Sequence, residues 1–406
     1  MYQRVEKPRI YASMGYYDYI NGYQRQDMDF SNSALINYSG GSSSLAQYNM
    51  LRTIDMDPYN PTIFQTDGET DPFMMVFRSG IYSNLAEHFI INYFGILGHN
   101  FYDCNAMFKV DVSDGDEDGS WESIPCTSLL NNHIVFDGQN YWNIPMKNYT
   151  DPGNDDPWID VIDNSNNYSN GTSMANLDGA SITSDLGKFI RITIAPKPFD
   201  DQGGFAEPDG NIVGFTGNVE IGSFIWGKYY DLKSPDLNYT MGFEYDGINT
   251  FESKESGKRF VNKHFDRNPG FCYKYQPFGV QHHKPSTSYN GRRWFNLQFT
   301  ALRDSYKDDY SNSDDPFVLP EYLTHSYHGF ASNDFYTQVV KRTMGGAAPF
   351  IFEFNRAEAE EDSHIALTGE HVEDNFIFAT FDNNNFSFDH SYHRMYSIGM
   401  KIRESW

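Results

Sequence analysis

Cysteine is scarce in this chain. Its 406 residues include only three, Cys104, Cys126 and Cys272. This odd and low count argues against a disulfide scaffold, and it predicts folding and assembly in a reducing cytoplasm.

Long apolar runs are missing as well. The run from Phe89 to Leu97 is well short of the roughly 20 apolar residues that span a bilayer. The basic residues near the N-terminus, Arg4, Lys7 and Arg9, precede no apolar segment of the kind that a signal peptide needs. We therefore expect no membrane insertion.

Positive charge is also in short supply. Lys and Arg number 30 against 55 Asp and Glu, so the net charge is 30 − 55 = −25. A surface this acidic repels the phosphates of nucleic acids and anionic membranes. We expect no nucleic-acid partner. The acidic charge suits either a plain solvated surface or a particle that stays soluble and holds cations.

The motifs of common enzymes are absent too. The chain has no G-x-S-x-G elbow, no Walker A loop, no H-E-x-x-H and no G-x-G-x-x-G after a strand. Pairs of carboxylates for glycoside hydrolysis can be drawn anywhere in so acidic a chain, so they indicate nothing. We expect no enzyme, and a polysaccharide-degrading activity is the least favoured interpretation.

Aromatic residues, by contrast, are abundant. They make up 17% of the chain, with 29 Tyr and 33 Phe, and Asn, Gly, Ser and Asp fill the stretches between. Aromatic side chains favour pleated, half-buried surfaces, whereas the small polar residues favour turns. Residues 188–195 and 218–231 alternate apolar and polar positions with the period of two that a strand has. The composition therefore predicts a mainly β protein with many turns.

Three segments carry a family resemblance. They are the apolar run Asn92–Asn100, which closes with Gly-His-Asn, the strand Lys188–Ala195 and the strand Asn218–Asp231. Together they resemble the discoidin-like, galactose-binding-like β-sandwich that tailed bacteriophages carry in their structural proteins. The resemblance implies a virion component.

The C-terminal part has a strand at Arg293–Leu302 and then a predicted helix from Asn333 to Thr343, for which Asn333 is a suitable N-cap. Gly345 and Gly346 stop that helix, and the aromatic strands from Pro349 to Ile402 follow. This order resembles the ring-forming domain of tail-tube and distal-tail proteins. We expect these strands, and an edge near residues 9–14, to pair or pack between subunits because exposed strand edges need covering.

The expected fold is a discoidin-like jelly-roll sandwich inserted in, or following, a tail-ring-type β domain with one short helix. Residues 1–75 would form the N-terminal part of the ring domain and residues 76–235 the sandwich. Residues 236–290 would form a connecting region with a basic hairpin at residues 250–264, and residues 291–406 the C-terminal part of the ring domain. The sandwich then interrupts the ring-type domain, whereas distal-tail proteins usually place the ring domain first.

By this resemblance the chain is a structural component of a phage virion, at the tail or the tail tip. It would form a ring of its own copies, contact other tail proteins and be assembled in the cytoplasm of the host bacterium. The alternative is an adsorption module that binds a host receptor or surface glycan.

A glycan would have one candidate site in the sandwich. A polar segment from about 147 to 180 is predicted as a long loop, and Trp158 stands in it beside Asp155, Asp156 and Asp160. An aromatic ring that stacks on a sugar, with carboxylates that hold its hydroxyls, is the usual chemistry of weak sugar capture. The alternative is that Trp158 docks against a neighbouring subunit, since Trp is enriched at interfaces.

Ca²⁺ is the only cofactor that the sequence suggests. Asp114, Asp116 and Asp118 alternate and precede Gly119, a spacing that lets carboxylates converge on a hard cation. Pro125 stands where an EF-hand has its bidentate Glu, so the segment is no EF-hand, and a solvated hairpin turn is the alternative. His99 and Asn100, at a strand end, are expected to satisfy backbone groups.

Overall fold

The computed structural model of the chain describes residues 5–20, 51–58, 61–70, 72–78, 93–113, 122–123, 127–128, 146–151, 154–161, 171–176, 189–196, 214–244, 248–252, 254, 259–263, 292–303, 334–355, 376–382, 386–393 and 395–405. Strands dominate in these residues, and the helices there are short. The predicted mainly β class is confirmed.

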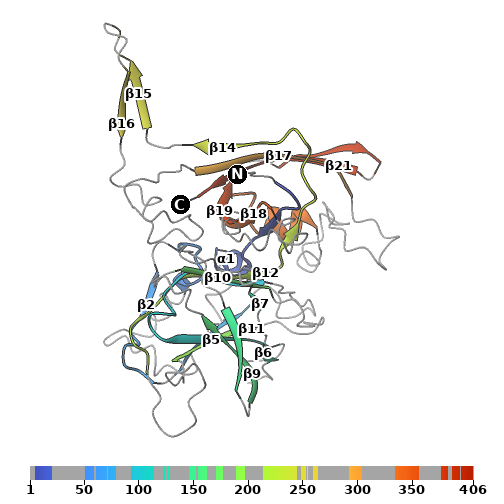
Figure 1. Cartoon of the computed structure of the whole chain (residues 1–406). Helices are drawn as coiled ribbons and strands as arrows, with labels where there is room; N and C mark the ends of the chain where they lie inside the picture. Colours follow the sequence, from blue (N-terminus) through green and yellow to red (C-terminus); the bar gives the residue numbers. More distant parts are fainter. Residues whose placement is uncertain are drawn as a thin grey trace, which may run out of the picture.

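Two antiparallel sheets face each other in the lower half of Figure 1. One has the order β2 (Thr62–Phe64), β12 (Val219–Gly227), β4 (Tyr93–His99), β10 (Gly171–Asn176) and β7 (Thr127–Ser128). The other has the order β3 (Phe73–Arg78), β11 (Phe189–Pro196), β5 (Ala106–Ser113), β9 (Asn154–Val161) and β8 (Met146–Asp151), and β6 (Glu122–Ser123) pairs with β5.

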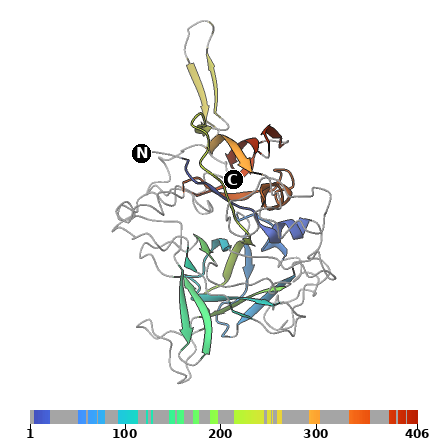
Figure 2. The ribbon, with the colours of Figure 1, turned by 90° about the vertical axis from the view of Figure 1, so that its right-hand side faces the viewer.

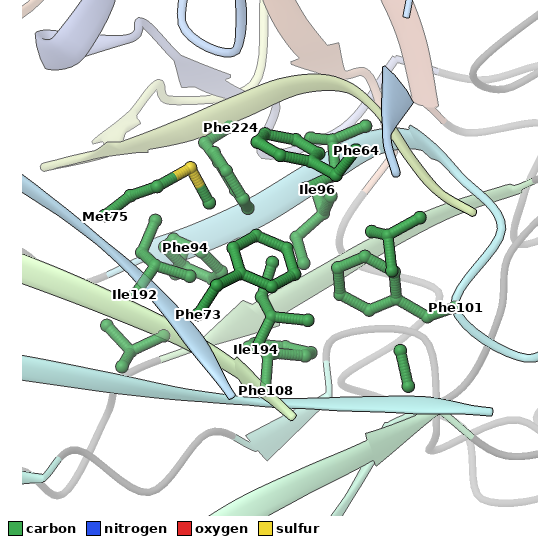
Figure 3. Packing of buried hydrophobic residues seen from close by; sticks show 14 of the residues in the cluster. Phe64, Phe73, Met75, Phe94, Ile96, Phe101, Phe108, Ile192, Ile194 and Phe224 are labelled. Carbon is green, nitrogen blue, oxygen red and sulfur yellow. The ribbon is translucent and has the colours of Figure 1, made fainter. Parts of the chain in front are cut away.

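The core of this sandwich is aromatic and aliphatic (Figure 3). Phe94 and Ile96 from β4 point toward Phe108 from β5 and Ile192 from β11, because alternate residues of a strand face the same side. Phe94 and Phe108 lie 5.9 Å apart between ring centroids, a distance typical of packed aromatic pairs.

The sheet that contains β4 is buried on both faces. Tyr93 and Leu97 of β4 and Ile225 of β12 pack, away from the sandwich core, in a second cluster with Tyr11 and Ile351. This explains why β4 is a nearly unbroken apolar run rather than an alternating one. The molecule therefore stacks three sheets, with the β4 sheet in the middle.

The third layer is an eight-stranded sheet formed by the two ends of the chain. Its order is β13 (Tyr230–Asp231), β1 (Arg9–Tyr11), β18 (Phe350–Glu353), β19 (Phe376–Phe381), β21 (Met395–Glu404), β17 (Arg292–Arg303) and β14 (Thr240–Glu244), with β20 (Phe388–Tyr392) on β21. We call it the terminal sheet. Since β1 precedes the sandwich and its neighbours follow it, the sandwich is inserted between strands of one sheet. The sandwich includes β2, which lies within the residues 1–75 that were expected in the ring domain.

Strand β1 lies inside this sheet and not at an edge. It pairs with both β13 and β18, and all three of its residues are buried. The prediction that residues 9–14 form an intersubunit edge is therefore wrong. The physical reason is that β13, which the sequence analysis did not separate from the strand predicted over residues 218–231, covers the exposed side of β1.

Two helices lie beside the sheets. Helix α1 (Met14–Ile20) follows β1, and η4 (Tyr336–Lys341) is a short π-helix within the predicted helix. The side chain of Asp334 accepts a hydrogen bond from the backbone N–H of Thr337 at 2.7 Å, and Asn333 lies outside the described residues. Gly345 and Gly346 have φ of 70° and 97°, a left-handed conformation that ends the helix as predicted.

A two-stranded hairpin stands apart from the three layers. It consists of β15 (Ile248–Glu252) and β16 (Arg259–Lys263), which lie within the predicted connecting region. Figures 1 and 2 show it projecting from the terminal sheet, on the side opposite the sandwich.

The prediction of a long loop from residue 147 to residue 180 is wrong. β8, β9 and β10 all fall in or at the start of this range. Dense Asn and Asp obscured the strand pattern, but pairing of β9 with the buried strand β5 supplies the partners that outweigh local propensity.

Candidate assembly surface

Two strands of the terminal sheet, β14 and β20, lie at open edges beside the paired strands β17 and β21. Among the described residues, β14 pairs only with β17, and β20 pairs only with β21. Each edge leaves backbone N–H and C=O groups that a further strand can pair with.

Both edges expose apolar side chains. Phe243 on β14 is 47% exposed, Leu237 just before β14 is fully exposed, and Tyr392 at the end of β20 is 76% exposed. Met395, the register partner of Tyr392, is also exposed. Met241 packs on the core, and Phe243 two residues later continues the same face beyond the core. Apolar groups at unpaired sheet edges mark a surface suited to association.

Buried ion pairs hold the strands behind these edges. The guanidinium of Arg293 donates to Glu404 at 3.0 and 3.2 Å and to the carbonyl of Phe376 at 3.2 Å, so it joins β17, β21 and β19. At the edge itself, Arg403 on β21 reaches Glu244 on β14 at 3.1 Å. These contacts fix β14, β17, β19 and β21 relative to one another, so the surface beside the open edge of β14 is rigid.

The outer face of the sheet is closely packed at β14. A Cβ added at Gly242 would lie 2.9 Å from the indole ring of Trp294, its register partner on β17. Trp294 therefore lies across the strand where other residues would project a side chain. At Gly242, therefore, no side chain of β14 projects from this face of the sheet, and the ring of Trp294 takes its place.

The predicted sugar-site residues all lie in β9, in the sandwich. Trp158, Asp156 and Asp160 occupy alternate positions of the strand. Ile159, the neighbour of Trp158, is the register partner of the core residue Phe108. The structure therefore places all four predicted residues on one strand of the sandwich.

The predicted calcium residues Asp114, Asp116 and Asp118 lie outside the described residues. In the part of the chain that is described, no group of three or more His, Cys, Asp or Glu side chains is arranged to hold a metal ion.

His99 and Asn100 satisfy backbone groups, as predicted. His99 Nδ1 accepts a hydrogen bond from the N–H of Phe101 at 3.3 Å. Asn100 donates to the carbonyl of Asn218 at 2.8 Å and accepts from the N–H of Glu220 at 2.7 Å. These bonds tie the end of β4 to the start of β12.

A buried charged cluster joins the sandwich to the terminal sheet, and sequence reasoning missed it. Arg342, just after η4, is 2% exposed and donates to the carbonyl of Lys228 at 3.3 Å. Burial lowers the pKa of Arg342 to about 10, and Tyr93, Asp18 and Asp334 partly oppose that shift. A single Arg at the end of a short helix is normally exposed, so no local signal marked it.

No protein-family model matches the sequence, and no curated protein matches it. No helix among the described residues is long and apolar enough to cross a membrane.

Proposed function

We propose that this protein is a structural component of a tailed-phage virion that assembles into a ring of its own copies. The observation that supports ring assembly is the pair of open, apolar edges on one sheet, β14 and β20. An interface between two different edges is heterologous, and such contacts close into rings when the rotation allows. A place at the tail or tail tip is supported by the sequence resemblance of residues 291–406 and of the sandwich.

The edges also favour assembly over a solitary binding module. A monomer with two open strand edges and exposed aromatic side chains risks indiscriminate aggregation, so such edges are normally short, charged or covered. Here β14 and β20 each have five residues, and Phe243 and Tyr392 are both exposed. Specific pairing between copies removes both edges at once.

The test is to place a charge on each edge. Phe243→Lys with Tyr392→Lys should convert the wild-type oligomer into monomers, because a lysine on each side leaves a buried charge in the interface. Sedimentation velocity should show the dissociation constant rising by at least about tenfold. Ile20→Lys is the matched control, because Ile20 is 40% exposed but lies on α1, away from both edges.

Two results contradict this proposal. One is a wild-type protein that stays monomeric at every concentration at which the particle would assemble. The other is a folded double variant whose sedimentation equals that of the wild type and of Ile20→Lys.

A second function, glycan capture by the sandwich, is supported by the register of β9. Trp158, Asp156 and Asp160 occupy alternate positions of β9, and Tyr149 on β8 is the register partner of Trp158. Two neighbouring aromatic residues beside carboxylates suit a sugar ring, and many copies in a ring would multiply weak affinity.

Trp158→Ala tests this second function. Normally assembled particles should lose adsorption to host cells, whereas Trp158→Phe should retain most of it because a ring remains to stack. If Trp158→Ala instead prevents assembly, and the particles that form adsorb normally, the residue belongs to a subunit interface and the glycan proposal fails.

A further inference from the structure

Two buried polar groups at the junction of the sandwich and the terminal sheet have no hydrogen-bond partner among the described residues. They are the hydroxyl of Tyr93 and Nε of Arg342. Tyr93 lies on β4 and is 0% exposed, and Arg342 follows η4 and is 2% exposed. Nearly all buried polar groups of native proteins bind another protein group or an ordered water, because a buried donor without a partner destabilises the fold. A ligand that accepts hydrogen bonds would satisfy both groups.

The two groups lie close together beside Gly227. A Cβ built on Gly227 would lie 3.1 Å from Nη1 of Arg342 and 3.4 Å from the hydroxyl oxygen of Tyr93. Nη1 and the hydroxyl oxygen are therefore separated by no more than the sum of these distances, whereas no direct hydrogen bond joins these two described residues. A single water, with two hydrogen bonds of about 2.8 Å each, suits a separation of this order.

Acceptors for the hydrogens of such a water lie around the same point. The carbonyl oxygen of Ala12 is 3.2 Å from the Cβ position at residue 227. Asp18 and Asp334 are buried as well. Burial lowers the pKa of Arg342 to about 10, and these two carboxylates oppose that shift, so both act on the guanidinium. Buried waters make about two to four hydrogen bonds to polar groups, and the junction supplies that number.

The charge of the junction favours a neutral ligand. Two basic residues, Lys228 and Arg342, lie with two acidic residues, Asp18 and Asp334, so their formal charges cancel. Burial lowers the pKa of Lys228 and Arg342 lowers it further, whereas Asp334 raises it. A bound anion would leave an uncompensated negative charge in this buried place, which is costly. Water satisfies the same donors and adds no charge.

We infer that the junction binds a buried water molecule through the hydroxyl of Tyr93 and Nε of Arg342. This water links β4 of the sandwich to the segment after η4, and η4 itself packs in the core of the terminal sheet through Val339 and Val340. Helix α1, which carries Asp18, lies between the two layers in Figure 1. The site lies within one copy of the chain, so it does not depend on the proposed assembly.

A high-resolution crystal structure of the wild-type protein tests the site directly. An ordered water should lie within about 2.6–3.2 Å of both the hydroxyl oxygen of Tyr93 and Nε of Arg342. Crystals soaked in sodium bromide should show no anomalous signal at this position. An anomalous peak there would assign a small anion and overturn the proposal, and so would well-ordered side chains with no water between them.

Tyr93→Phe gives a second test, because the sign of its effect distinguishes a hydrated site from a dry one. If the hydroxyl binds a water, its loss removes a hydrogen bond, and the melting temperature should fall by about 1–4 °C. If the site is dry, loss of the hydroxyl relieves a desolvation cost, and the melting temperature should stay the same or rise. The second result overturns the proposal.

Tyr11→Phe is the matched control. Tyr11 is also fully buried, its ring centroid lies 5.1 Å from that of Tyr93, and its hydroxyl donates directly to Glu353 at 2.7 Å. This substitution should lower the melting temperature too, but crystals of Tyr11→Phe should retain the water at the junction. Crystals of Tyr93→Phe should lose it. A water that stays unchanged in Tyr93→Phe does not bind the hydroxyl, and that outcome contradicts the proposal.

Discussion

The buried imidazole of His99 makes the stability of the sandwich depend on pH. His99 is fully buried in β4, and burial lowers its pKa from 6.5 to about 3. In the unfolded chain the ring takes up a proton below about pH 6.5, whereas in the folded protein it stays neutral down to about pH 3. The pKa shift of His99 therefore has no effect on the free energy of unfolding above pH 6.5, and it destabilises the fold progressively as the pH falls from 6.5 to 3.

We predict that His99→Gln removes this dependence. Between about pH 6.5 and 4.5 the wild type should lose about 1.4 kcal/mol per pH unit relative to the variant, measured by urea unfolding. The glutamine oxygen can still accept the hydrogen bond from Phe101. Asp55, whose pKa burial raises to about 6, has the opposite sign, since its neutral form favours the fold as the pH falls below 6. It is present in both proteins and cancels in the difference, so parallel stability curves would contradict the prediction.

Single residues were predictable where a local rule governs them. His99 and Asn100 follow an apolar run and satisfy backbone groups, which a strand end requires. Arg342 and Asp111 were not predictable in this way. Asp111 is fully buried and paired with Arg191 at 2.8 Å, and Arg342 is buried where α1, β12 and η4 meet. Burial at such places depends on elements that are distant in the sequence.

At the scale of elements, strands rich in apolar residues were found, whereas the polar strand β9 was not. β11 alternates apolar and polar residues, and β4 and β12 are mostly apolar because their sheet is covered on both sides. β13 falls within the strand predicted over residues 218–231, but its separation from β12 was not predicted. β9 contains Asp155, Asp156, Pro157 and Asp160, so it has no pattern that propensity can detect, and it is held by pairing with β5.

Strand β21 has a structural role in the terminal sheet that its sequence alone does not indicate. It pairs with β17, β19 and β20, and it contributes Ile398, Met400 and Ile402 to the core. Deleting residues 395–406 therefore disrupts the terminal sheet itself as well as any contact between copies. Substitutions at Phe243 and Tyr392 are the sharper test of assembly, because both side chains are exposed.

The end of β12, where the chain passes from the sandwich to the terminal sheet, tolerates no side chain. Gly227 has φ of 155°, and a Cβ there would lie 3.1 Å from Nη1 of Arg342 and 3.2 Å from the carbonyl oxygen of Ala12. We predict that Gly227→Ala destabilises the protein by about 1–3 kcal/mol, through backbone strain and overpacking at the charged cluster.

Gly217→Ala is the matched control for Gly227→Ala. Its φ lies outside the left-handed region, and its nearest neighbour would be Cys104 at an ordinary 3.9 Å. Thermal unfolding should separate the two variants by several degrees. Equal melting temperatures of the two variants would contradict the prediction, because they would mean that the backbone around residue 227 accommodates a Cβ without loss of stability.

At the scale of the whole molecule, the stack of three sheets was not predictable from the sequence. The interruption of the terminal domain by the sandwich was expected from the order of motifs, and β1 in the terminal sheet agrees with it. The contact between layers was not expected. Tyr11, Tyr93 and Ile351 come from three distant segments, and nothing in the sequence around any one of them indicates that they share a cluster.

The position of β1 has a consequence for the time at which the chain folds during translation. β1 precedes the sandwich, yet one of its two neighbours, β18, begins at Phe350, and the hydroxyl of Tyr11 bonds to Glu353 across 342 positions of sequence. At elongation rates of roughly 5–20 residues per second, β1 waits on the order of tens of seconds for β18 to leave the ribosome. All the strands of the sandwich are made in the meantime, so the sandwich is able to fold first. The terminal sheet is completed only when synthesis has passed β21, so the ring that we propose could form only after that strand is made.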